Sequence, residues 1–372
     1  MNVILKNGDA MQVAENATCL QAASAISEGL ARNAVCAKVN GEEVDLSHVL
    51  KEGDALEIVT LKDKEGLHVY RHTCAHVLAQ ALKTIYPTCK LSIGPVIENG
   101  FYYDVDFVTP INKDDLAKIE AEMQKIIKSN LPIERFTLPR EEAIKLMDGY
   151  DEKYKVELIE DLPEGETISF YKQGNFTDLC RGPHVPHTGF SKASKILSAA
   201  GAYWRGDEKN PMLSRLYGTA FADEKALNAY LKQLEEAKRR DHRKLGRELG
   251  FFTFHEDVAP GVVCWLLKGM LMRTILEDFW RREHIKRNYD LVQGPQLLRV
   301  ETWQRSGHYD HYRQNMYFTQ IEDDQYGIKP MNCISHMLIY RNDLRSYRDL
   351  PQRYFELGVV HRHEKSGTLH GL

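Results

Sequence analysis

The sequence predicts an α+β protein of several domains, and three observations lead to this prediction. The chain has 372 residues, and at about 100–200 residues per domain this length corresponds to two to four domains. Hydrophobic residues make up 43% and charged residues 27%, as in ordinary globular proteins, which excludes wholesale disorder and a fibrous repeat. Glycine-punctuated strand-like runs alternate with amphipathic helical stretches along the chain.

The composition also argues against secretion and against a membrane span. The first ten residues contain no basic stretch followed by an apolar core, so no secretory signal is expected. No apolar run reaches the ~18 residues that a bilayer span requires. The seven cysteines contain no CxxC pair and are odd in number, which favours reduced thiols. We therefore expect a cytoplasmic protein without a membrane partner, while the net charge of −4 neither indicates nor excludes a nucleic acid.

Residues 1–62 are predicted to form a small ubiquitin-like domain. Apolar runs flank the Asn-Gly-Asp turn at 7–9, which is a strong hairpin signal. One short helix is expected between its N-cap Thr18 and Gly29, and two further strands complete a β-β-α-β-β order on a mixed sheet. The charged segment 62–66 is the expected domain boundary.

Residues 63–224 are predicted to form a second α+β domain. A helix over 67–86 should end before Pro87, which cannot continue it. A strand at 100–106 and a helix over 113–129 belong to the same domain.

Residues 225–249 are predicted to form one long basic helix that connects this domain to the next. Between positions 232 and 247, seven Lys/Arg stand against three Asp/Glu, a local charge of +4. A solvated connector and a helix that faces phosphates both explain this pattern.

Residues 250–372 are predicted to form part of a further domain. The last expected strand has no hairpin partner after it, which indicates a domain that is cut short. The expected elements are, in order, a helix over 263–287, a strand at 328–331, a helix over 333–340, a strand at 354–362 and a loop at 364–372.

Two residue pairs with the same spacing predict a functional site in the second domain. His72 and His76 are four residues apart on a predicted helix, so both rings project from one face, about 6 Å apart at Cβ. Cys180 and His184 share this spacing on a loop, since the Gly-Pro at 182–183 cannot continue a helix. Three imidazoles and a thiol suit either a tetrahedral zinc site or acid and base groups around a water molecule.

Weaker candidates lie near the C-terminal end. Cys333 begins a predicted helix, where the helix dipole favours a thiolate, although a single cysteine is more often a buried apolar residue. Arg362 ends a predicted strand and could hold a phosphate with two hydrogen bonds. An ion pair with Glu364 is an equally good explanation of that arginine.

Together these motifs closely resemble the bacterial threonyl-tRNA synthetase family of class II aminoacyl-tRNA synthetases, over the whole chain. The domains resemble those of the family in order: a TGS domain at 1–62, an editing domain at 63–224, a connector at 225–249 and the N-terminal part of the antiparallel-sheet catalytic domain at 250–372. The motifs that carry the resemblance are HTCAH at 72–76, CRGPH at 180–184, AGAYWRGD at 200–207, the end of motif 1 at 294–295, and motif 2 at 354–372 with SGTLHG at 366–371.

The resemblance implies ATP- and Mg-dependent ligation of threonine to tRNA-Thr by a homodimer, and hydrolysis of mischarged seryl-tRNA. It also implies a zinc ion on Cys333 and two further histidines, which are expected to be absent from this chain. Such a zinc ion rejects valine because valine lacks the hydroxyl that would bind the metal. Serine keeps the hydroxyl and loses one methyl contact, worth about 1–3 kcal/mol. A second, hydrolytic site is therefore needed.

For the editing site, the resemblance implies that His72 activates water with assistance from Lys155. The other side chains that line or orient the pocket are His76, Cys180 and His184, with Tyr103 and Asp178 as weaker candidates. The family pocket is regarded as metal-free, whereas the related alanyl domain uses similar ligands for zinc, so a zinc ion here stays an alternative.

For the synthetic site, the resemblance implies that Arg362 binds the ATP α-phosphate, that Glu364 recognises adenine, and that Met331 and Cys333 border the amino-acid pocket. Ile334-Ser335 replaces the usual Pro-Gly of the family and puts the start of this helix in doubt. Because the chain stops inside motif 2, we expect it to edit, but neither to activate threonine nor to bind zinc tightly at Cys333.

Two other functions are compatible with these modules. One is a free-standing deacylase that clears seryl-tRNA in trans. The other is a non-catalytic RNA-binding or regulatory module, which would have no use for both residue pairs.

Overall fold

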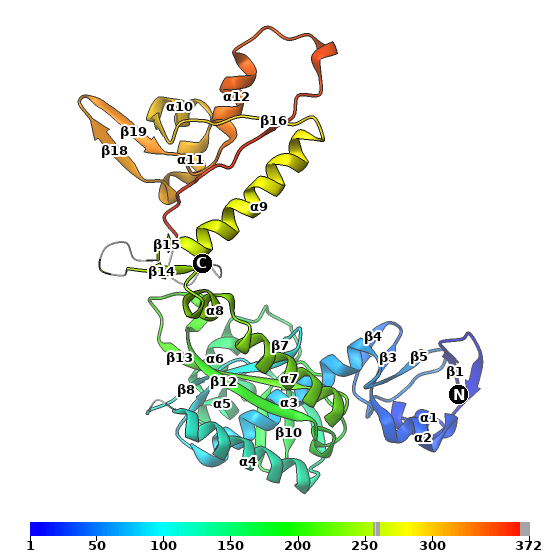
Figure 1. The fold of residues 1–372 in the computed structure, drawn as a ribbon. Coiled ribbons are helices and arrows are strands. Elements are labelled where there is room, and N and C mark those ends of the chain that lie inside the picture. The colour runs from blue at the N-terminus through cyan, green and yellow to red at the C-terminus, as the bar shows by residue number, and fades with distance from the viewer. Residues whose placement is uncertain (110, 256, 258–260, 365–372) are drawn as a thin grey trace. The chain divides into compact units, whose positions relative to one another are not determined.

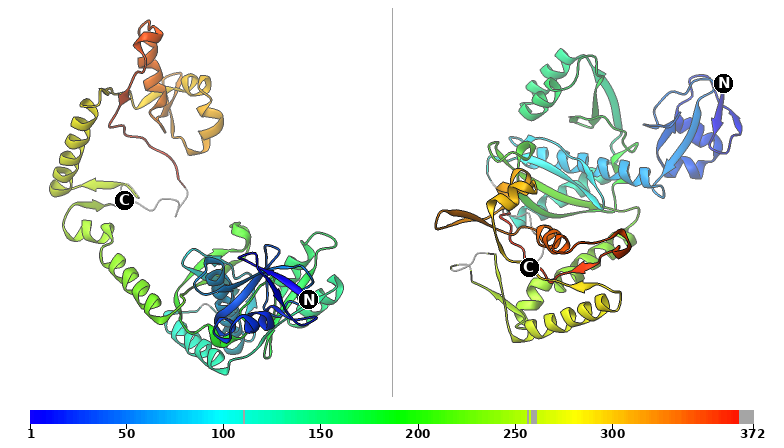
Figure 2. Two further views of the ribbon diagram at one scale, coloured as in Figure 1. Left: turned by 90° about the vertical axis from the view of Figure 1, so that its right-hand side faces the viewer. Right: turned by 90° about the horizontal axis from the view of Figure 1, so that it is seen from above.

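The structure is a computed structural model that describes residues 1–109, 111–255, 257 and 261–364. Contacts divide the chain into two compact units, Met1–Glu235 and Glu236–Leu372. Helices and strands are mixed in both units (Figures 1 and 2), which confirms the predicted α+β class. None of the helices within the described residues is long and apolar enough to cross a membrane.

The first unit begins with the predicted mixed sheet, in the strand order β2-β1-β5-β3-β4, with β1 parallel to β5. Its elements are β1 (Asn2–Leu5), β2 (Ala10–Gln12), α1 (Cys19–Ile26), α2 (Glu28–Asn33), β3 (Ala34–Val39), β4 (Glu42–Val44) and β5 (Ala55–Thr60). Thr18 caps α1 in a capping box with Gln21. The expectation of a single helix that ends before Gly29 is wrong, because the Ser27 side chain accepts the Leu30 amide and starts a second helix there.

Two sheets and the helices α3 to α6 follow among the described residues of the same unit. The larger sheet has the order β12-β13-β8-β6 with β7 on β8, and the smaller one has the order β11-β10-β9. The helices are α3 (Lys64–Ile85), α4 (Lys113–Ser129), α5 (Arg140–Gly149) and α6 (Lys153–Glu160). The strands are β6 (Lys90–Leu91), β7 (Val96–Ile97), β8 (Gly100–Asp106), β9 (Ile133–Leu138), β10 (Ile168–Gln173), β11 (Phe176–Leu179), β12 (Ser194–Tyr203) and β13 (Met212–Ala220).

Helix α3 lies in the centre of this unit. It contacts α4, the strands β8 and β13 of the larger sheet, and β3 and β5 of the preceding sheet. Val77 and Leu78 are fully buried in one apolar core with Val35 and Val59. The N-terminal sheet therefore shares a core with α3.

A glycine near the start of α3 packs directly against the backbone of β5. Gly66 is buried, and a Cβ atom there would lie 1.9 Å from the carbonyl oxygen of Thr60. We expect Gly66→Ala to lower the free energy of unfolding by about 2–3 kcal/mol, since the backbone must move to relieve the clash. Gly149→Ala in α5, where a Cβ meets nothing within 4 Å, should instead raise it by roughly 0.5 kcal/mol. Urea unfolding of both variants checks this, and equal midpoints would contradict it.

The predicted single helix over 225–249 is wrong, because the chain forms α7 (Glu224–Arg239) and α8 (His242–Glu248). Asp241 causes the break. Its carboxylate accepts the amide hydrogens of Arg243 and Lys244, at 2.8 and 3.4 Å, so it acts as the N-cap of a new helix.

The second unit contains several small sheets. One sheet is antiparallel, in the order β17-β19-β18. The others are the hairpin β14-β15 and the parallel pair β16-β20. The strands are β14 (Phe252–Phe254), β15 (Val263–Trp265), β16 (Asp290–Leu291), β17 (Leu297–Arg299), β18 (Phe318–Ile321), β19 (Asp324–Ile328) and β20 (Tyr354–Phe355). The helices are α9 (Leu267–Ile285), α10 (Val300–Arg305), α11 (His308–Tyr312) and α12 (Cys333–Arg341). Short 3-10 turns lie in both units: η1 (Thr188–Phe190) and η2 (Trp204–Gly206) in the first, η3 (Arg313–Asn315) and η4 (Tyr347–Asp349) in the second.

Three predictions for this unit need correction. The helix expected over 263–287 begins only at Leu267, because 263–265 pairs with β14. The strand expected at 328–331 ends at Ile328. The strand expected at 354–362 shortens to two residues, since within the described residues only Tyr354 and Phe355 pair, with β16. The predicted loop residues 365–372 lie outside the described part of the chain.

Candidate active site

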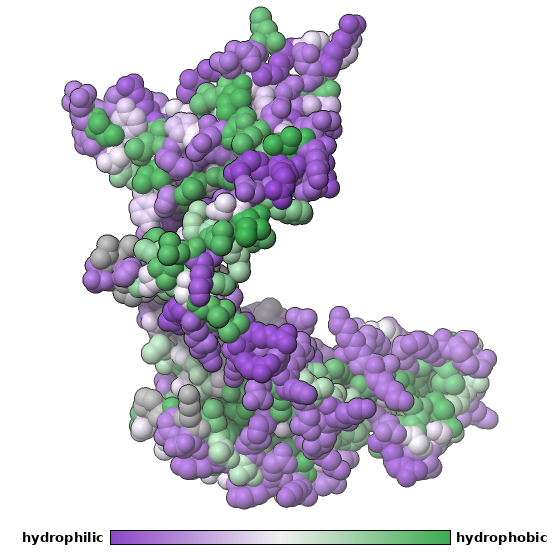
Figure 3. Space-filling model, in the orientation of Figure 1, coloured by the Kyte–Doolittle hydropathy of each residue, from purple (hydrophilic) through white to green (hydrophobic). Residues whose placement is uncertain are grey.

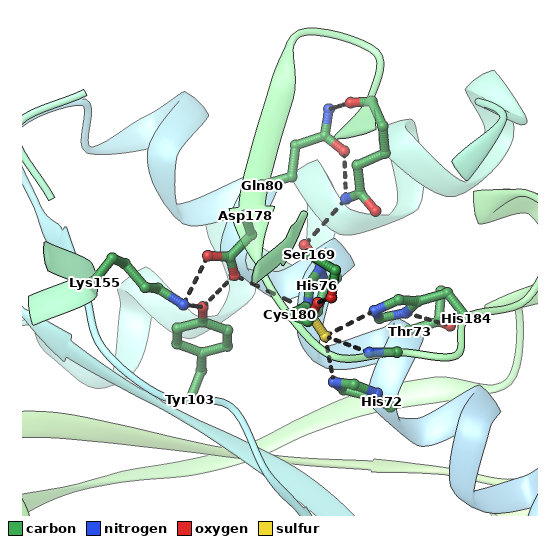
Figure 4. A network of polar contacts seen from close by, with 12 residues as sticks. His72, Thr73, His76, Gln80, Tyr103, Lys155, Ser169, Asp178, Cys180 and His184 are labelled. Carbon is green, nitrogen blue, oxygen red and sulfur yellow. Dashed lines mark hydrogen bonds and ion pairs between the residues drawn. The ribbon is translucent and has the colours of Figure 1, made fainter. Parts of the chain in front are cut away.

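Four side chains predicted from the paired motifs meet in the first unit (Figure 4): His72, His76, Cys180 and His184. One potential ligand atom from each lies within 4.8 Å of the others. The Cys180 Sγ atom is 3.2 Å from Nε2 of His72 and 3.3 Å from Nε2 of His184. The four-residue spacing along α3 places the rings of His72 and His76 on one face, with centroids 5.3 Å apart. The loop after β11 supplies the other two.

The local chain geometry of this loop depends on a glycine. Gly182 has a φ of +74°, which a side chain would strain, and its amide donates to Sγ of Cys180 at 3.3 Å. A Cβ atom on Gly182 would also lie 1.7 Å from the hydroxyl oxygen of Tyr171. The loop can therefore turn back toward α3 only with glycine at this position.

Thr73 orients one of the imidazoles. Its Oγ1 atom lies 3.0 Å from Nδ1 of His184 and accepts the Val185 amide at 3.1 Å. The other ring nitrogen of His184, Nε2, consequently points toward Cys180. Thr73 lies inside the HTCAH motif, but the histidine spacing alone gives it no role.

A second, charged group lies beside the histidines and comes from three other elements. Lys155 of α6 forms an ion pair with Asp178 of β11, with Nζ 2.7 Å from Oδ1. Tyr103 of β8 donates to Oδ2 of Asp178 at 2.6 Å and accepts from Lys155 at 3.0 Å. All three side chains are buried. Asp178 connects this group to the histidines, because its Oδ2 atom is 3.9 Å from Nε2 of His76.

Burial keeps the imidazoles and the thiol uncharged. Desolvation lowers the pKa of His72 to about 3 and that of His76 to about 4, and it holds the pKa of His184 well below its usual value. Desolvation also raises the pKa of the Cys180 thiol to about 12. At neutral pH each imidazole therefore offers one nitrogen lone pair, and the sulfur carries its proton.

The carboxylate behaves in the opposite way. Burial alone would raise the pKa of Asp178, but attraction to Lys155 and the hydrogen bonds from Lys155 and Tyr103 hold it below its usual value. The site thus combines neutral histidines with one buried ion pair.

The histidine–cysteine group has the donor set of a zinc site. Three imidazoles and one sulfur are ligands that zinc takes in four-coordinate sites. The hydrogen bond between Thr73 and Nδ1 of His184 is the kind of outer contact that metal-binding histidines make. The residues present fit a zinc ion, and they also fit acid–base chemistry on a bound water.

The synthetic-site candidates lie in the second unit. Cys333 begins α12, and its Sγ atom is 3.0 Å from Nε2 of His308. His308 was missed, because no periodic pattern links positions 25 residues apart. Within the described residues, three or more potential metal ligands cluster only at His72, His76, Cys180 and His184.

The other candidates of this unit are less closely grouped. Arg362 donates from Nε to the carbonyl oxygen of Pro330 at 3.1 Å, next to the half-buried Met331. Glu364 is half-buried at the end of the described residues. Ile334 and Ser335, which replace Pro-Gly, are buried, and α12 starts at Cys333 as predicted.

Three segments of the chain are similar to known protein families. Three family models match: "TGS domain" at 1–60, "Threonyl and Alanyl tRNA synthetase second additional domain" at 168–217 and "tRNA synthetase class II core domain (G, H, P, S and T)" at 317–372. A threonine–tRNA ligase of Desulfovibrio desulfuricans is 68% identical over 332 residues, 89% of this chain and 51% of that protein. One of Nitratidesulfovibrio vulgaris is 58% identical over 374 residues, 100% of this chain and 58% of its own length.

A solved structure of the RNA-binding domain of threonyl-tRNA synthetase from Cryptosporidium parvum is 41% identical, covers 36% of this chain and 33% of its own, and has a TM-score of 0.34. The chain spans little more than half the length of the curated relatives it matches.

Proposed function

Because the chain corresponds to the N-terminal portion of a class II threonyl-tRNA synthetase, we propose that its first unit hydrolyses mischarged seryl-tRNA. The observation that carries this proposal is the convergence of His72, His76, Cys180 and His184 beside the buried Lys155–Asp178 pair. Catalytic sites are where several titratable groups with shifted pKa values gather in this way.

In the proposed reaction, water attacks the carbonyl carbon of the seryl ester. His72 takes the proton of this water, since its imidazole is unprotonated at neutral pH. The bond between the carbonyl carbon and the ribose oxygen breaks, and the proton passes to that oxygen, which releases serine and tRNA. Lys155 assists this proton transfer indirectly. It pairs with Asp178, and Asp178 is the residue of the pair that approaches an imidazole, that of His76.

Crowding among the histidine rings supports a preference for the smaller amino acid. The ring centroids of His72 and His76 lie 4.4 and 4.2 Å from that of His184. Serine lacks the methyl group of threonine, and a close-packed pocket can exclude that methyl by overlap. We propose that this is the second sieve of the enzyme.

The test is a deacylation assay with this chain on purified seryl-tRNA and threonyl-tRNA, at concentrations well above the expected affinity. The proposal requires that seryl-tRNA is hydrolysed at least ~100-fold faster than threonyl-tRNA, given what one methyl can discriminate. Absence of hydrolysis with a folded chain would reject it, and equal rates would reject the sieve.

Metal dependence is a separate prediction. Zinc held by three of these four side chains would leave one position for water and would lower the pKa of that water. We propose the metal-free route through His72 instead. Deacylation should then persist after dialysis against a chelator. Elemental mass spectrometry should find less than about 0.1 zinc ion per dialysed chain. Loss of activity that returns on adding zinc would overturn this assignment.

For the whole protein, we propose ATP- and Mg-dependent ligation of threonine to tRNA-Thr in the cytoplasm, as the family implies. Arg362 and Glu364 would contact ATP, and Met331 and Cys333 would border the threonine and zinc sites. Threonine-dependent exchange of pyrophosphate into ATP tests this proposal.

We further propose that the whole protein forms a homodimer through the second unit. Helix α9 leaves large apolar side chains exposed there, among them Leu267 at 92% and Leu271 at 63%, and Figure 3 shows apolar residues gathered over this helix. Exposed apolar patches of this kind mark interaction surfaces.

A further inference from the structure

One acidic residue of the ubiquitin-like domain reaches the loop that carries Cys180 and His184. Asp45 directly follows β4, and one carboxylate oxygen, Oδ1, accepts the backbone amide of His184 at 2.9 Å. Its other oxygen, Oδ2, accepts the hydroxyl of Tyr171 at 2.7 Å. Both contacts join positions more than 120 residues apart in the chain.

Tyr171 lies between Asp45 and the imidazole of His184 and contacts both. Its ring packs edge-on against that of His184, with centroids 4.4 Å apart. Its hydroxyl occupies the space that only a glycine at 182 leaves free. Asp45 therefore contacts the backbone of His184 directly and its imidazole indirectly, through the ring of Tyr171.

The position of Asp45 is itself well defined. The next residue, Leu46, is buried in the core of the N-terminal domain, and its carbonyl accepts the Leu20 amide at 2.9 Å. This domain in turn shares buried residues such as Val35 and Val59 with α3, the helix that carries His72 and His76. The N-terminal domain thus contributes to two apolar cores, one around Leu46 and one shared with α3, and these support the two sides of the site.

We propose that Asp45 is a positioning residue of the hydrolytic site, so that the ubiquitin-like domain holds His184 and its loop in the reactive arrangement. This inference rests on the deacylase proposed above. Asp45 touches neither the substrate nor the reacting water. It acts by restricting where the His184 ring and the Cys180 sulfur lie relative to α3.

The test uses three variants of the full chain. Asp45→Ala removes both acceptors and should lower kcat for seryl-tRNA hydrolysis about 10–100-fold, with KM within twofold, since loss of an orienting contact costs this much. Asp45→Asn keeps one oxygen acceptor for the His184 amide and should stay within threefold of wild type. Glu43→Ala is the control. Glu43 is an exposed residue of β4, two positions earlier, and its replacement should leave kcat and KM unchanged.

Amide hydrogen exchange of the peptide that spans 180–187 supplies a readout independent of activity. In Asp45→Ala, the amide hydrogen of His184 should exchange at least tenfold faster than in wild type. The circular dichroism spectrum and the melting temperature should stay near those of wild type. A folded Asp45→Ala chain with unchanged kcat, or with unchanged exchange at His184, overturns the inference. If the wild-type chain hydrolyses no seryl-tRNA, the proposed function fails by itself, and the exchange measurement still decides whether Asp45 holds the loop.

Discussion

His72→Ala is expected to reduce the deacylation of seryl-tRNA by about 10²–10⁴-fold, the usual effect of removing a general base. The imidazole of His72 is uncharged at neutral pH because burial lowers its pKa to about 3, and its Nε2 atom faces the sulfur of Cys180 at 3.2 Å. Single-turnover hydrolysis at saturating enzyme measures the chemical step directly.

His68→Ala is the matched control for this variant. His68 lies one turn earlier on α3, and its side chain is exposed. The control should hydrolyse seryl-tRNA at the wild-type rate and melt at the same temperature. A His72→Ala chain that is folded and retains more than a tenth of the wild-type rate would show that another group activates the water. His76, 3.9 Å from Asp178, would then be the next candidate.

The sequence was sufficient to predict features that depend on neighbours along the chain. The N-cap at Thr18, the helix over 113–129 and the shared face of His72 and His76 all follow from residue types and short spacings along the chain. The break at Asp241 also had a local signal, an N-cap aspartate, but the run of basic residues around it resembles a continuous helix.

Features that depend on distant partners could not be derived in this way. Tyr103, Lys155 and Asp178 lie on three elements, and only the resemblance to a family suggested that they belong to one site. Asp45 and His308 had no signal at all, since their contacts join residues 139 and 25 positions apart. The strand expected at 354–362 has strand-forming residues, yet pairing limits it to two of them.

Lys155→Met is expected to lower the free energy of unfolding by about 3–5 kcal/mol, because it leaves the buried carboxylate of Asp178 without its counter-charge. The two side chains are only 4% and 3% exposed, so water cannot replace the lost partner. Methionine keeps most of the length of the lysine side chain, and the effect therefore reports the charge and not a cavity. Urea unfolding followed by circular dichroism measures it.

Lys153→Met is the control, two residues earlier on the same helix. Lys153 pairs with Asp106 at 3.0 Å, but these side chains are 54% and 30% exposed, and loss of such a pair should cost at most about 1 kcal/mol. If both variants unfold at the same urea concentration, the buried pair does not have the importance that its geometry indicates.

The double variant Lys155→Met/Asp178→Asn separates stability from chemistry. It removes both charges together, and replacing a buried ion pair by neutral groups is often close to neutral for stability. The asparagine oxygen can still accept the Tyr103 hydroxyl. We therefore expect most of the lost stability to return, while deacylation stays at least ~10²-fold below wild type because the charge beside His76 is gone. Recovery of activity together with stability would mean that the Lys155–Asp178 pair only supports the fold and takes no part in hydrolysis.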